Sequence, residues 1–432
     1  TLSPFYIVGL DVSPDFARDS TVAMTYLLWG FYLSEDAGAT WEAHNDGVMD
    51  YPRGNGLSRL FAPVFSPDFA SDRTIFTSTW YRILKSTDAG DHWRQILPVD
   101  EAWWDSSPNH HGMSLVLSPD YEDDGVVFMG THRGRVFRSD DGGETFRRLD
   151  DVAGAVGSLA ISPAFARDQT IFVGDTRGVR RSEDGGATWT FSALIEPELY
   201  QEFELSPFYD GALRAAWLEQ QSGGRDKSLA IKLAISPAFA NDGVVFAGTA
   251  NGLFRSADGG FGWQQVRAAP FDHRGYVEAV AVSPAFARDG TVLVSIRGEG
   301  TFRSRDGGTT FHEVAHELIR EHNPPTQYIG FTPKFPAIVF SPDFAEDQTV
   351  FAFSGTTLLR STDGGEHFEV LDTPDERWID RAHVWAAYYI QRPIERTLRS
   401  PRRLAALALV LVVAAAVAVF AVRRRWHRLA FE

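Results

Sequence analysis

The sequence contains no cysteine among its 432 residues. Disulfide bonds, thiol catalysis and cysteine-ligated metal sites are therefore excluded, although the absence of cysteine does not by itself identify a compartment. Basic residues are also scarce, with 41 Lys and Arg against 57 Asp and Glu and a formal net charge of −16. Because proteins bind nucleic acid through clustered Lys and Arg, this balance argues against a nucleic-acid partner.

Long apolar runs are missing except near the end of the chain. There, Leu404 to Val422 form nineteen residues without a charged or polar side chain. At a rise of about 1.5 Å per residue, this run would match the roughly 30 Å hydrocarbon core of a bilayer. It predicts a transmembrane helix, with the lipid bilayer as a partner. The segment from Gln391 to Glu432 carries nine Arg against two Glu, so this tail is basic and the rest of the chain is acidic.

What the sequence does contain is a repeated eight-residue phrase, Ser-x-Asp-x-Gly-x-x followed by Trp or Phe. An Asp side chain can bond backbone amides two residues further on, and Gly adopts a positive φ without steric cost, so each phrase predicts a tight turn. The phrase occurs seven times. Its Asp residues are Asp36, Asp88, Asp141, Asp184, Asp258, Asp306 and Asp363.

A second phrase, Ser-Pro-x-Phe or Ser-Pro-x-Tyr, precedes every turn at a distance of 22 or 23 residues from its Ser to the turn Asp. This near-constant spacing indicates a repeated structural unit. Between the phrases lie short β-branched runs such as Thr170 to Thr176, which are typical of strands. With a further apolar run before the Ser-Pro phrase and another after the turn, each unit holds four strands.

The turn Asp recurs after 52, 53, 43, 74, 48 and 57 residues, and most of this variation falls between a turn and the next Ser-Pro phrase. Four strands in about 40 to 50 residues are the signature of a propeller blade. The sequence therefore predicts an all-β, seven-bladed β-propeller with one variable connection per blade. Ser206 to Trp217 is a candidate for a decayed eighth blade, and Thr1 to Leu10 for an extra strand where the ring closes.

The turn phrase resembles the Asp-box, or bacterial neuraminidase repeat. The whole unit is similar to the repeat of sialidase-like, sortilin-like and photosystem-assembly propellers, over about Ser13 to Leu371. The resemblance implies the fold more strongly than an activity, because such propellers include hydrolases, sorting receptors and assembly factors without catalysis. His92, Gly262 and His367 stand where Thr is usual, and each replacement is expected to remove one local hydrogen bond.

Arginines flank both ends of the apolar run, so the positive-inside rule barely discriminates between the two orientations. The chain begins at Thr1 rather than Met, as it would after removal of a signal peptide, and a cluster of arginines follows the run directly at Arg423. We therefore expect the propeller to lie outside the cytoplasm, in the periplasm or at the cell surface. A tail-anchored cytoplasmic propeller is the competing topology.

Between the last repeat and the apolar run, Trp378, Trp385 and Tyr389 fall on one face at helical spacing. Trp and Tyr favour the membrane interface, so this juxtamembrane face predicts a helix that lies at the interface or against a partner. Packing of the same face on the propeller rim is an equal alternative. Pro393 and Pro401 would interrupt any continuous helix into the membrane.

The string from His312 to His322 matches the ligand positions of the zinc signature HExxHxxGxxH, with Ile319 in place of Gly. That chemistry requires His312 and His316 on one face of a helix. His312 directly follows the aromatic of a turn, where other repeats begin their outer strand. On a strand, residues four apart are separated by about 13 Å, too far to share a metal ion. We therefore expect no metal site, and the sequence offers no cofactor motif.

Sialidase chemistry would need an Arg triad, a Tyr nucleophile with a Glu partner and an acid Asp. Tyr81 begins a string similar to the FRIP phrase of that family, but the string runs into the turn Ser86 in the register of an ordinary blade strand. The arginines that fill this register are interpreted as repeat features rather than a substrate clamp. They are Arg138, Arg181, Arg255, Arg303 and Arg360. Carboxylates on the loops leave a glycoside hydrolase open.

Three long insertions are where a specific function is expected, because loops on a rigid scaffold carry binding. They span Val99 to Met113, Glu196 to Lys232 and Glu321 to Pro336. The first contains a candidate aromatic platform for sugar or peptide, formed by Trp103, Trp104, His110 and His111. Its alternative role is to cover a blade edge.

We therefore expect a propeller over residues 1–372, a juxtamembrane segment over 373–403, a transmembrane helix over 404–422 and a short basic tail over 423–432. The predicted function is binding without catalysis, as a scaffold or accessory subunit among membrane protein subunits. A membrane-anchored glycoside hydrolase or glycan-binding protein of the sialidase-like type is the alternative.

Overall fold

The structure is a computed structural model, and it describes residues 7–26, 30–48, 60–79, 82–96, 112–131, 134–149, 156–194, 231–271, 276–296, 299–314, 337–354 and 357–372. All of them belong to one compact unit, Thr1–Met49 with Leu57–Pro374. The second unit, Asp50–Gly56 with Asp375–Glu432, lies outside the described residues. The decayed-blade candidate from Ser206 to Trp217 also lies outside them.

The described residues form seven antiparallel four-stranded sheets, numbered here as blades 1 to 7 along the chain. Blade 1 comprises β1 (Ile7–Val12), β2 (Val22–Tyr26), β3 (Gly30–Ser34) and β4 (Glu42–Ala43). Blade 2 comprises β5 (Val64–Phe65), β6 (Ile75–Ser78), β7 (Ile83–Ser86) and β8 (Arg94–Ile96). Blade 3 comprises β9 (Gly112–Leu117), β10 (Val126–Thr131), β11 (Val136–Asp140) and β12 (Arg147–Arg148).

The remaining four blades repeat this order. Blade 4 comprises β13 (Val156–Ile161), β14 (Ile171–Asp175), β15 (Gly178–Ser182) and β16 (Thr190–Ala193). Blade 5 comprises β17 (Lys232–Ile235), β18 (Val245–Thr249), β19 (Gly252–Ser256) and β20 (Gln264–Gln265). Blade 6 comprises β21 (Val277–Val282), β22 (Val292–Ile296), β23 (Gly300–Ser304) and β24 (His312–Val314). Blade 7 comprises β25 (Ile338–Phe340), β26 (Val350–Ser354), β27 (Thr357–Ser361) and β28 (Glu369–Leu371).

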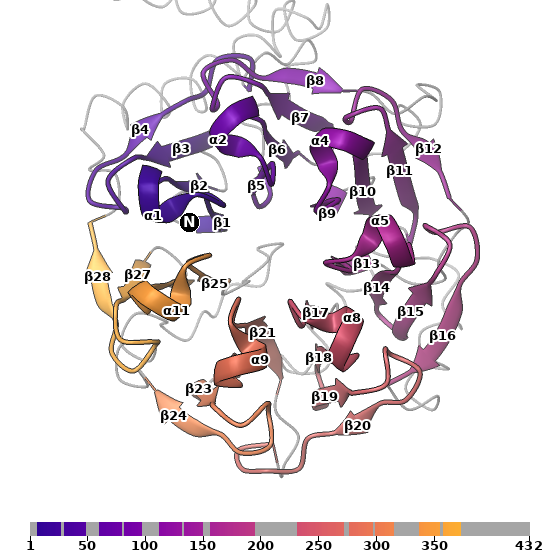
Figure 1. Ribbon diagram of the computed structural model, residues 1–432. Helices are drawn as coiled ribbons and strands as arrows, with labels where there is room; N and C mark the ends of the chain where they lie inside the picture. The colour runs from indigo at the N-terminus through magenta and orange to yellow at the C-terminus, as the bar shows by residue number, and fades with distance from the viewer. Residues whose placement is uncertain are drawn as a thin grey trace, which may run out of the picture. The chain divides into compact units, whose positions relative to one another are not determined.

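The seven blades surround a central axis as a closed ring, which confirms the predicted propeller (Figure 1). Each innermost strand contacts the innermost strand of the next blade, and β25 contacts β1 to close the circle. Every blade is one continuous stretch of chain, so side-chain contacts rather than an exchanged strand close the ring. Ile7 to Leu10 form the start of β1, the regular innermost strand of blade 1, and not an extra strand.

One turn of helix follows the Ser-Pro phrase between the first and second strands of every blade. The seven turns are α1 (Phe16–Asp19), α2 (Phe69–Asp72), α4 (Tyr121–Asp124), α5 (Phe165–Asp168), α8 (Phe239–Asp242), α9 (Phe286–Asp289) and α11 (Phe344–Asp347). Each ends on a residue with positive φ, for example Ser20 at 51° and Gly125 at 59°. The carbonyl of this residue accepts the N–H of the Asp-box residue that follows Asp, as in the 2.9 Å bond from Ala37 to Ser20.

Aromatic pairs join most neighbouring blades through their cores. The Phe of a second strand meets the Phe or Tyr of the next blade's helical turn edge to face, with ring centroids 5.6 to 6.1 Å apart. Such geometry adds about 0.5 to 1.5 kcal/mol beyond area burial. One pair, Phe351 with Phe16, spans the closure between blade 7 and blade 1. The ring closure is therefore packed like an internal junction.

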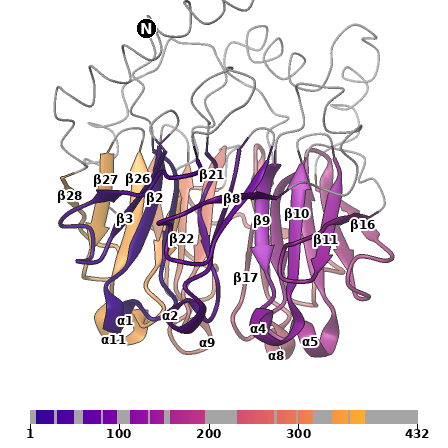
Figure 2. The same cartoon turned by 90° about the horizontal axis from the view of Figure 1, so that it is seen from above.

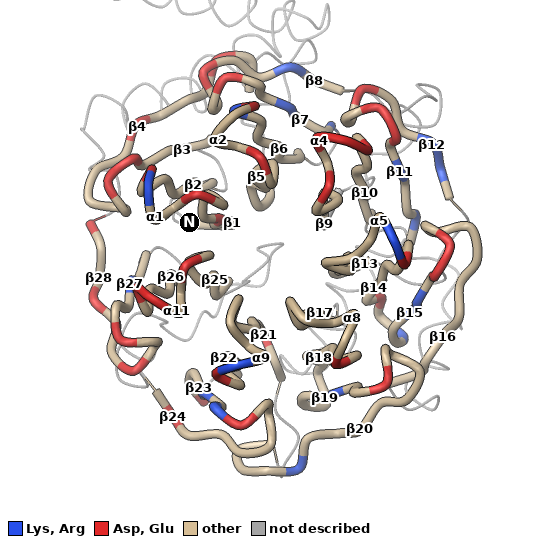
Figure 3. Tube along the Cα trace, viewed as in Figure 1, with Lys and Arg blue, Asp and Glu red and all other residues tan. Residues whose placement is uncertain are grey.

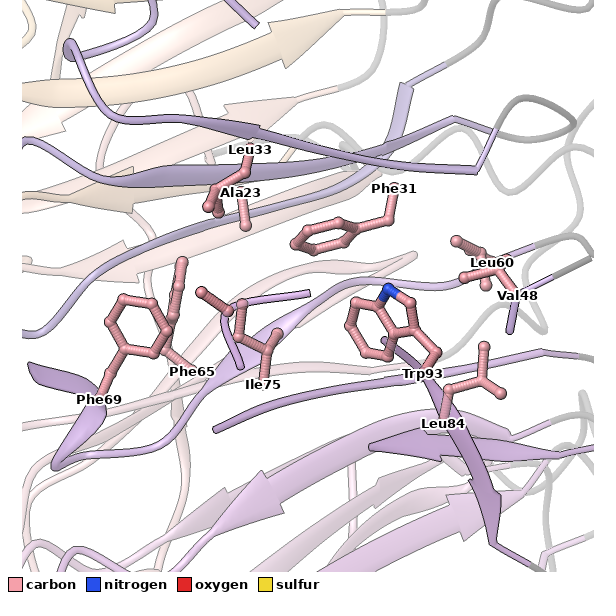
Figure 4. Close-up of a cluster of buried hydrophobic side chains, with 11 residues drawn as sticks. Ala23, Phe31, Leu33, Val48, Leu60, Phe65, Phe69, Ile75, Leu84 and Trp93 are labelled. Carbon is pink, nitrogen blue, oxygen red and sulfur yellow. The ribbon is translucent and has the colours of Figure 1, made fainter. Parts of the chain in front are cut away.

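The junction between blades 1 and 2 is built differently. Ala23 occupies the position of the second-strand Phe, and Leu33 occupies that of the basic residue before the Asp-box. Here Trp93 packs against Phe31, with ring centroids 4.9 Å apart, inside a buried apolar cluster (Figure 4). The backbone N–H of Trp93 donates to the Asp46 carbonyl at 2.9 Å, which attaches the end of blade 1 to blade 2.

The residue after the Asp of each Asp-box is left-handed in all seven blades, yet it is Gly in only five. Ala37 and Ala89 adopt φ of 57° and 60°. A left-handed conformation costs a residue other than Gly roughly 1 to 2 kcal/mol. Replacement by Gly removes this strain but also makes the unfolded chain more flexible, which offsets part of the gain. We therefore expect Ala37→Gly and Ala89→Gly each to raise Tm by about 1 to 3 °C in a thermal melt.

The matched control is Ala39→Gly, two residues from Ala37 in the same turn but without a positive φ. It should lower Tm, because there Gly adds only unfolded-state freedom. Equal effects of Ala37→Gly and Ala39→Gly would contradict the assignment of strain to Ala37.

Candidate functional site

The carboxylates of the Asp-boxes are held inside their own turns. In blade 4 the Ser182 hydroxyl donates to Asp184 at 2.7 Å, while the Thr188 N–H and hydroxyl donate at 2.8 and 2.6 Å. The Thr188 hydroxyl, followed by the Thr188 N–H and the Ser182 hydroxyl, lowers the pKa of Asp184 to about 2. The Ser182 oxygen also accepts the Gly186 N–H at 2.8 Å. These bonds recur around the ring and define the geometry of the turn.

The His residues at the Thr position keep a bond that was expected to be lost. His92 Nδ1 lies 2.7 Å from Asp88 Oδ2, and His367 Nδ1 lies 2.7 Å from Asp363 Oδ2. An imidazole nitrogen therefore replaces the Thr hydroxyl, so the expectation of a missing bond was wrong for both. At Gly262 the expectation holds, because this residue supplies only its backbone N–H to Asp258, at 2.8 Å.

Six Asp-boxes have a basic residue directly before their Ser, called here the ring cation, and in four blades this residue links its blade to the next. It donates to the carbonyl of the residue that follows Asp in the neighbouring Asp-box. The bonds are Lys85 Nζ to Gly142 (2.8 Å), Arg138 Nη1 to Gly185 (2.9 Å), Arg303 Nη1 to Gly364 (2.7 Å) and Arg360 Nη1 to Ala37 (3.0 Å). The interpretation of these cations as repeat features agrees with this geometry. They hold the ring together, and the last bond spans its closure.

A second carboxylate that recurs in every blade was missed by the sequence reasoning. The Ser of each Ser-Pro phrase donates to an Asp six residues later, as Ser13 does to Asp19 at 2.5 Å, and the same Asp accepts a backbone N–H two residues further on. The other pairs are Ser66 with Asp72, Ser118 with Asp124, Ser162 with Asp168, Ser236 with Asp242, Ser283 with Asp289 and Ser341 with Asp347. The constant spacing of six would have revealed it.

The two faces of the ring differ in what they carry. Within a blade the chain turns through the Ser-Pro phrase and the Asp-box at one face, called here the box face, where the helical turns lie (Figure 2). Since the four strands alternate in direction, every fourth strand ends at the opposite face and the next blade begins there. All blade-to-blade connections, the three long insertions included, therefore attach to this second face, called here the loop face.

Negative charge is concentrated on the box face. The seven Ser-Pro turns and seven Asp-boxes, eight residues each, contain 27 Asp and Glu against five Lys and Arg. Even with the six cations that precede the Asp-boxes, the box face keeps an excess of 16 negative charges, equal to the formal charge of the whole chain. Figure 3 shows acidic segments at the Asp-boxes and helical turns around the ring. The box face will therefore repel anions and attract basic segments.

Several predicted site residues lie outside the described residues. These are the candidate platform of Trp103, Trp104, His110 and His111, the juxtamembrane residues Trp378, Trp385 and Tyr389, and the apolar run Leu404 to Val422. Within the part of the chain that the structure describes, no helix is long and apolar enough to span a membrane.

The zinc-like string does not begin on a helix. His312–Val314 forms β24, and His312 pairs with Arg303 on β23. A strand at this point is what the turn phrase predicts and is incompatible with helical i, i+4 ligands. His316 and His322 lie outside the described residues.

Three ionisable residues interrupt the apolar pattern of the innermost strands in the described part of the ring: Asp11 on β1, Lys232 on β17 and Glu278 on β21. Asp11 accepts the N–H of Phe65 in the neighbouring blade at 3.0 Å. Burial raises the pKa of Asp11 to about 6. Burial lowers the pKa of Lys232 to about 8, and the negative charge of Glu278 offsets part of this lowering. Sequence reasoning missed them, although their departure from the repeat was visible.

Fold and repeats together define an Asp-box β-propeller. No family model matches the chain. A xyloglucanase of Paenibacillus sp is 29% identical over 193 residues, which is 37% of this chain and 18% of that protein. The chain therefore spans less than a fifth of this relative.

Solved propellers of two kinds are similar in structure. The GH74 xyloglucanase from Xanthomonas campestris matches with a TM-score of 0.56 and 16% identity over 83% of this chain and 52% of its own. YCF48 from Cyanidioschyzon merolae matches with a TM-score of 0.52 and 17% identity over 83% of this chain and 96% of its own. YCF48 bound to D1 peptide matches with a TM-score of 0.52 and 16% identity over 84% of this chain and 93% of its own. At such identities the likeness shows the fold alone.

The raised pKa of Asp11 gives the ring a specific pH dependence. Asp11 stabilises the fold fully below its ordinary pKa near 4, and this contribution is lost as the pH rises through about 6, because the folded protein must then hold a buried charge. We expect Tm to rise when the pH falls from 7.5 to 5.0, and Asp11→Asn to reduce that rise by about 2 to 4 °C.

The measurement is a series of thermal melts between pH 4.5 and 8. Asp19→Asn is the matched control, because Asp19 holds a helical turn instead of crossing between blades. Parallel curves for the wild type and Asp11→Asn would contradict a raised pKa at Asp11.

Proposed function

We propose that this protein is a membrane-anchored, extracytoplasmic propeller that binds a protein partner through its loop face, as a scaffold or accessory subunit of a membrane protein complex. The observation that carries this proposal is that the fourth strand of every blade ends, and the first strand of the next blade begins, at the same face of the ring. Loops of variable length on a rigid ring form a binding surface whose shape the repeats do not dictate.

The use of the repeated polar groups favours binding over catalysis. In the described blades the Asp-box carboxylates receive hydrogen bonds from their own turns, and most of the ring cations donate to the neighbouring blade. A carboxylate with a pKa near 2, as at Asp184, is a poor general acid or base at neutral pH. Chemistry on the repeats themselves is therefore disfavoured.

The extent of the similar propellers also supports a binding role. The chain matches YCF48 over nearly the whole length of that protein, and one such propeller has been solved with a bound D1 peptide. A single ring of this size is thus sufficient for peptide binding in a protein of the same fold. We assign to the present chain a peptide partner as well, and the predicted anchor leads us to expect that this peptide is a segment of a membrane protein.

Membrane attachment completes the proposal. The run from Leu404 to Val422 has the length and composition of a spanning helix. An anchor of this kind keeps the propeller close to membrane-protein partners and raises their effective concentration.

Purification from the native membrane in mild detergent tests the proposal. We expect membrane proteins to co-purify in stoichiometric amounts, and the pair Trp103→Ala and Trp104→Ala to reduce their recovery about tenfold, because Trp residues are frequent hot spots of binding. The readout is quantitative mass spectrometry of the co-purified proteins.

Phe191→Ala is the matched control, since Phe191 is an exposed aromatic of the outer strand β16 and is not part of the insertion Val99 to Met113. Its recovery should equal that of the wild type. A propeller that purifies alone, or equal losses for both variants, would overturn the proposed role of the loop face.

A glycan-directed function is the second candidate, and the partial likeness to xyloglucanases favours it. In that case the purified protein would bind or cleave a β-glucan without any co-purifying partner. Incubation with xyloglucan, followed by analysis of released oligosaccharides and by affinity electrophoresis, separates the two candidates.

A further inference from the structure

Arg181 is the ring cation of blade 4, and its environment departs from that of Arg138, Arg303 and Arg360. Only 7% of its surface is exposed. Its Nη2 donates to Glu183 of the same blade at 2.7 Å, while Nε and Nη1 are buried without a hydrogen-bond acceptor. At Arg138, Arg303 and Arg360 the Nη1 group donates to a carbonyl of the next blade. Buried donors without an acceptor are energetically costly, and an added acceptor would remove this cost.

The side chain that covers Arg181 also breaks the repeat. At the sixth position of the Asp-box, Glu144 pairs with Lys85 and Glu366 pairs with Arg303 across their junctions. The same position in blade 5 is Phe261. Its ring lies 4.1 Å from the Arg181 guanidinium carbon and is 61% exposed, the most exposed of the large apolar side chains in the described residues.

The turn that carries Phe261 has one side-chain hydrogen bond fewer than the other Asp-boxes. Phe261 lies between Gly260 and Gly262, and Gly262 lacks the hydroxyl or imidazole that bonds the Asp carboxylate elsewhere. The missing side-chain hydrogen bond lowers the local stability of this turn. This Asp-box is therefore the one in which the covering ring can most easily turn aside from the guanidinium.

The charges around Arg181 select the kind of ligand. Glu183 already balances the guanidinium, and Asp184 and Asp258 in the adjoining Asp-boxes are acidic. A further carboxylate would meet net repulsion, whereas a neutral carbonyl can accept from Arg181 as backbone carbonyls do at the other junctions. Basic side chains beside that carbonyl would be attracted by the surrounding acids.

We propose that Arg181 and Phe261 form a docking site on the box face for a basic, extended peptide segment of a partner protein. A backbone carbonyl of the peptide accepts from Arg181, an apolar side chain packs on Phe261, and Arg or Lys residues lie against Glu183 and Asp258. The site goes beyond the proposed function, because it lies on the box face and uses no residue of the loop face.

The test uses the full chain in mild detergent and a fluorescein-labelled, amidated octapeptide of alternating Arg and Leu, followed by fluorescence anisotropy. Phe261→Glu introduces the residue found at this position in blades 3 and 7. Its carboxylate should pair with Arg181 and so compete with the peptide. We expect it to weaken peptide binding about tenfold, the value of one charge-assisted hydrogen bond. Arg181→Gln should weaken binding to a similar degree.

Thr309→Glu is the matched control, because Thr309 holds the same Asp-box position in blade 6. It adds the same negative charge to the same face and should leave the affinity unchanged or slightly higher. Docking at Arg181 predicts that Phe261→Glu weakens peptide binding. General attraction of a basic peptide to an acidic face predicts that the added negative charge strengthens it. Equal or tighter binding by Phe261→Glu would overturn the site, whatever the outcome of co-purification.

Discussion

The hydrogen bonds between Ser, Asp and Thr within each Asp-box are the constraint on which the rest of the ring depends. They close a turn in which the residue after Asp is left-handed, and that conformation turns its carbonyl toward the preceding blade. The carbonyl then accepts from the neighbouring cation, as at Gly185. A local turn, about eight residues long, therefore determines how one sheet is placed against the next.

Two kinds of contact carry this placement around the circle, one polar and one apolar. The cation-to-carbonyl bonds lie at the box face, and the edge-to-face aromatic pairs lie deeper in the blades. Where both are absent, between blades 1 and 2, Trp93 and the residues after β4 provide a different junction. The ring tolerates such exceptions because each junction is a separate set of contacts.

The repeat phrases were sufficient to predict the fold, since their number and spacing specify seven four-stranded blades. They also indicated that Arg138 and its counterparts belong to the scaffold. Other features depend on contacts between blades that spacing cannot reveal. The ring of Phe261 lying on Arg181 becomes apparent only when neighbouring blades are placed together. The imidazole of His92 replacing a hydroxyl is instead a matter of side-chain geometry within one turn, which spacing does not reveal either. The candidate platform at Trp103 stays a prediction, because it lies outside the described residues.

The closure of the ring without strand exchange has a consequence for how the protein can change over evolution. Because blade 7 meets blade 1 through the same contacts as internal neighbours, no junction is marked as the start of the chain. The position of the termini along the chain is thus independent of the arrangement of the blades in space. A gene encoding this ring could be rearranged circularly, with new termini in any loop-face connection, and still specify the same set of interfaces.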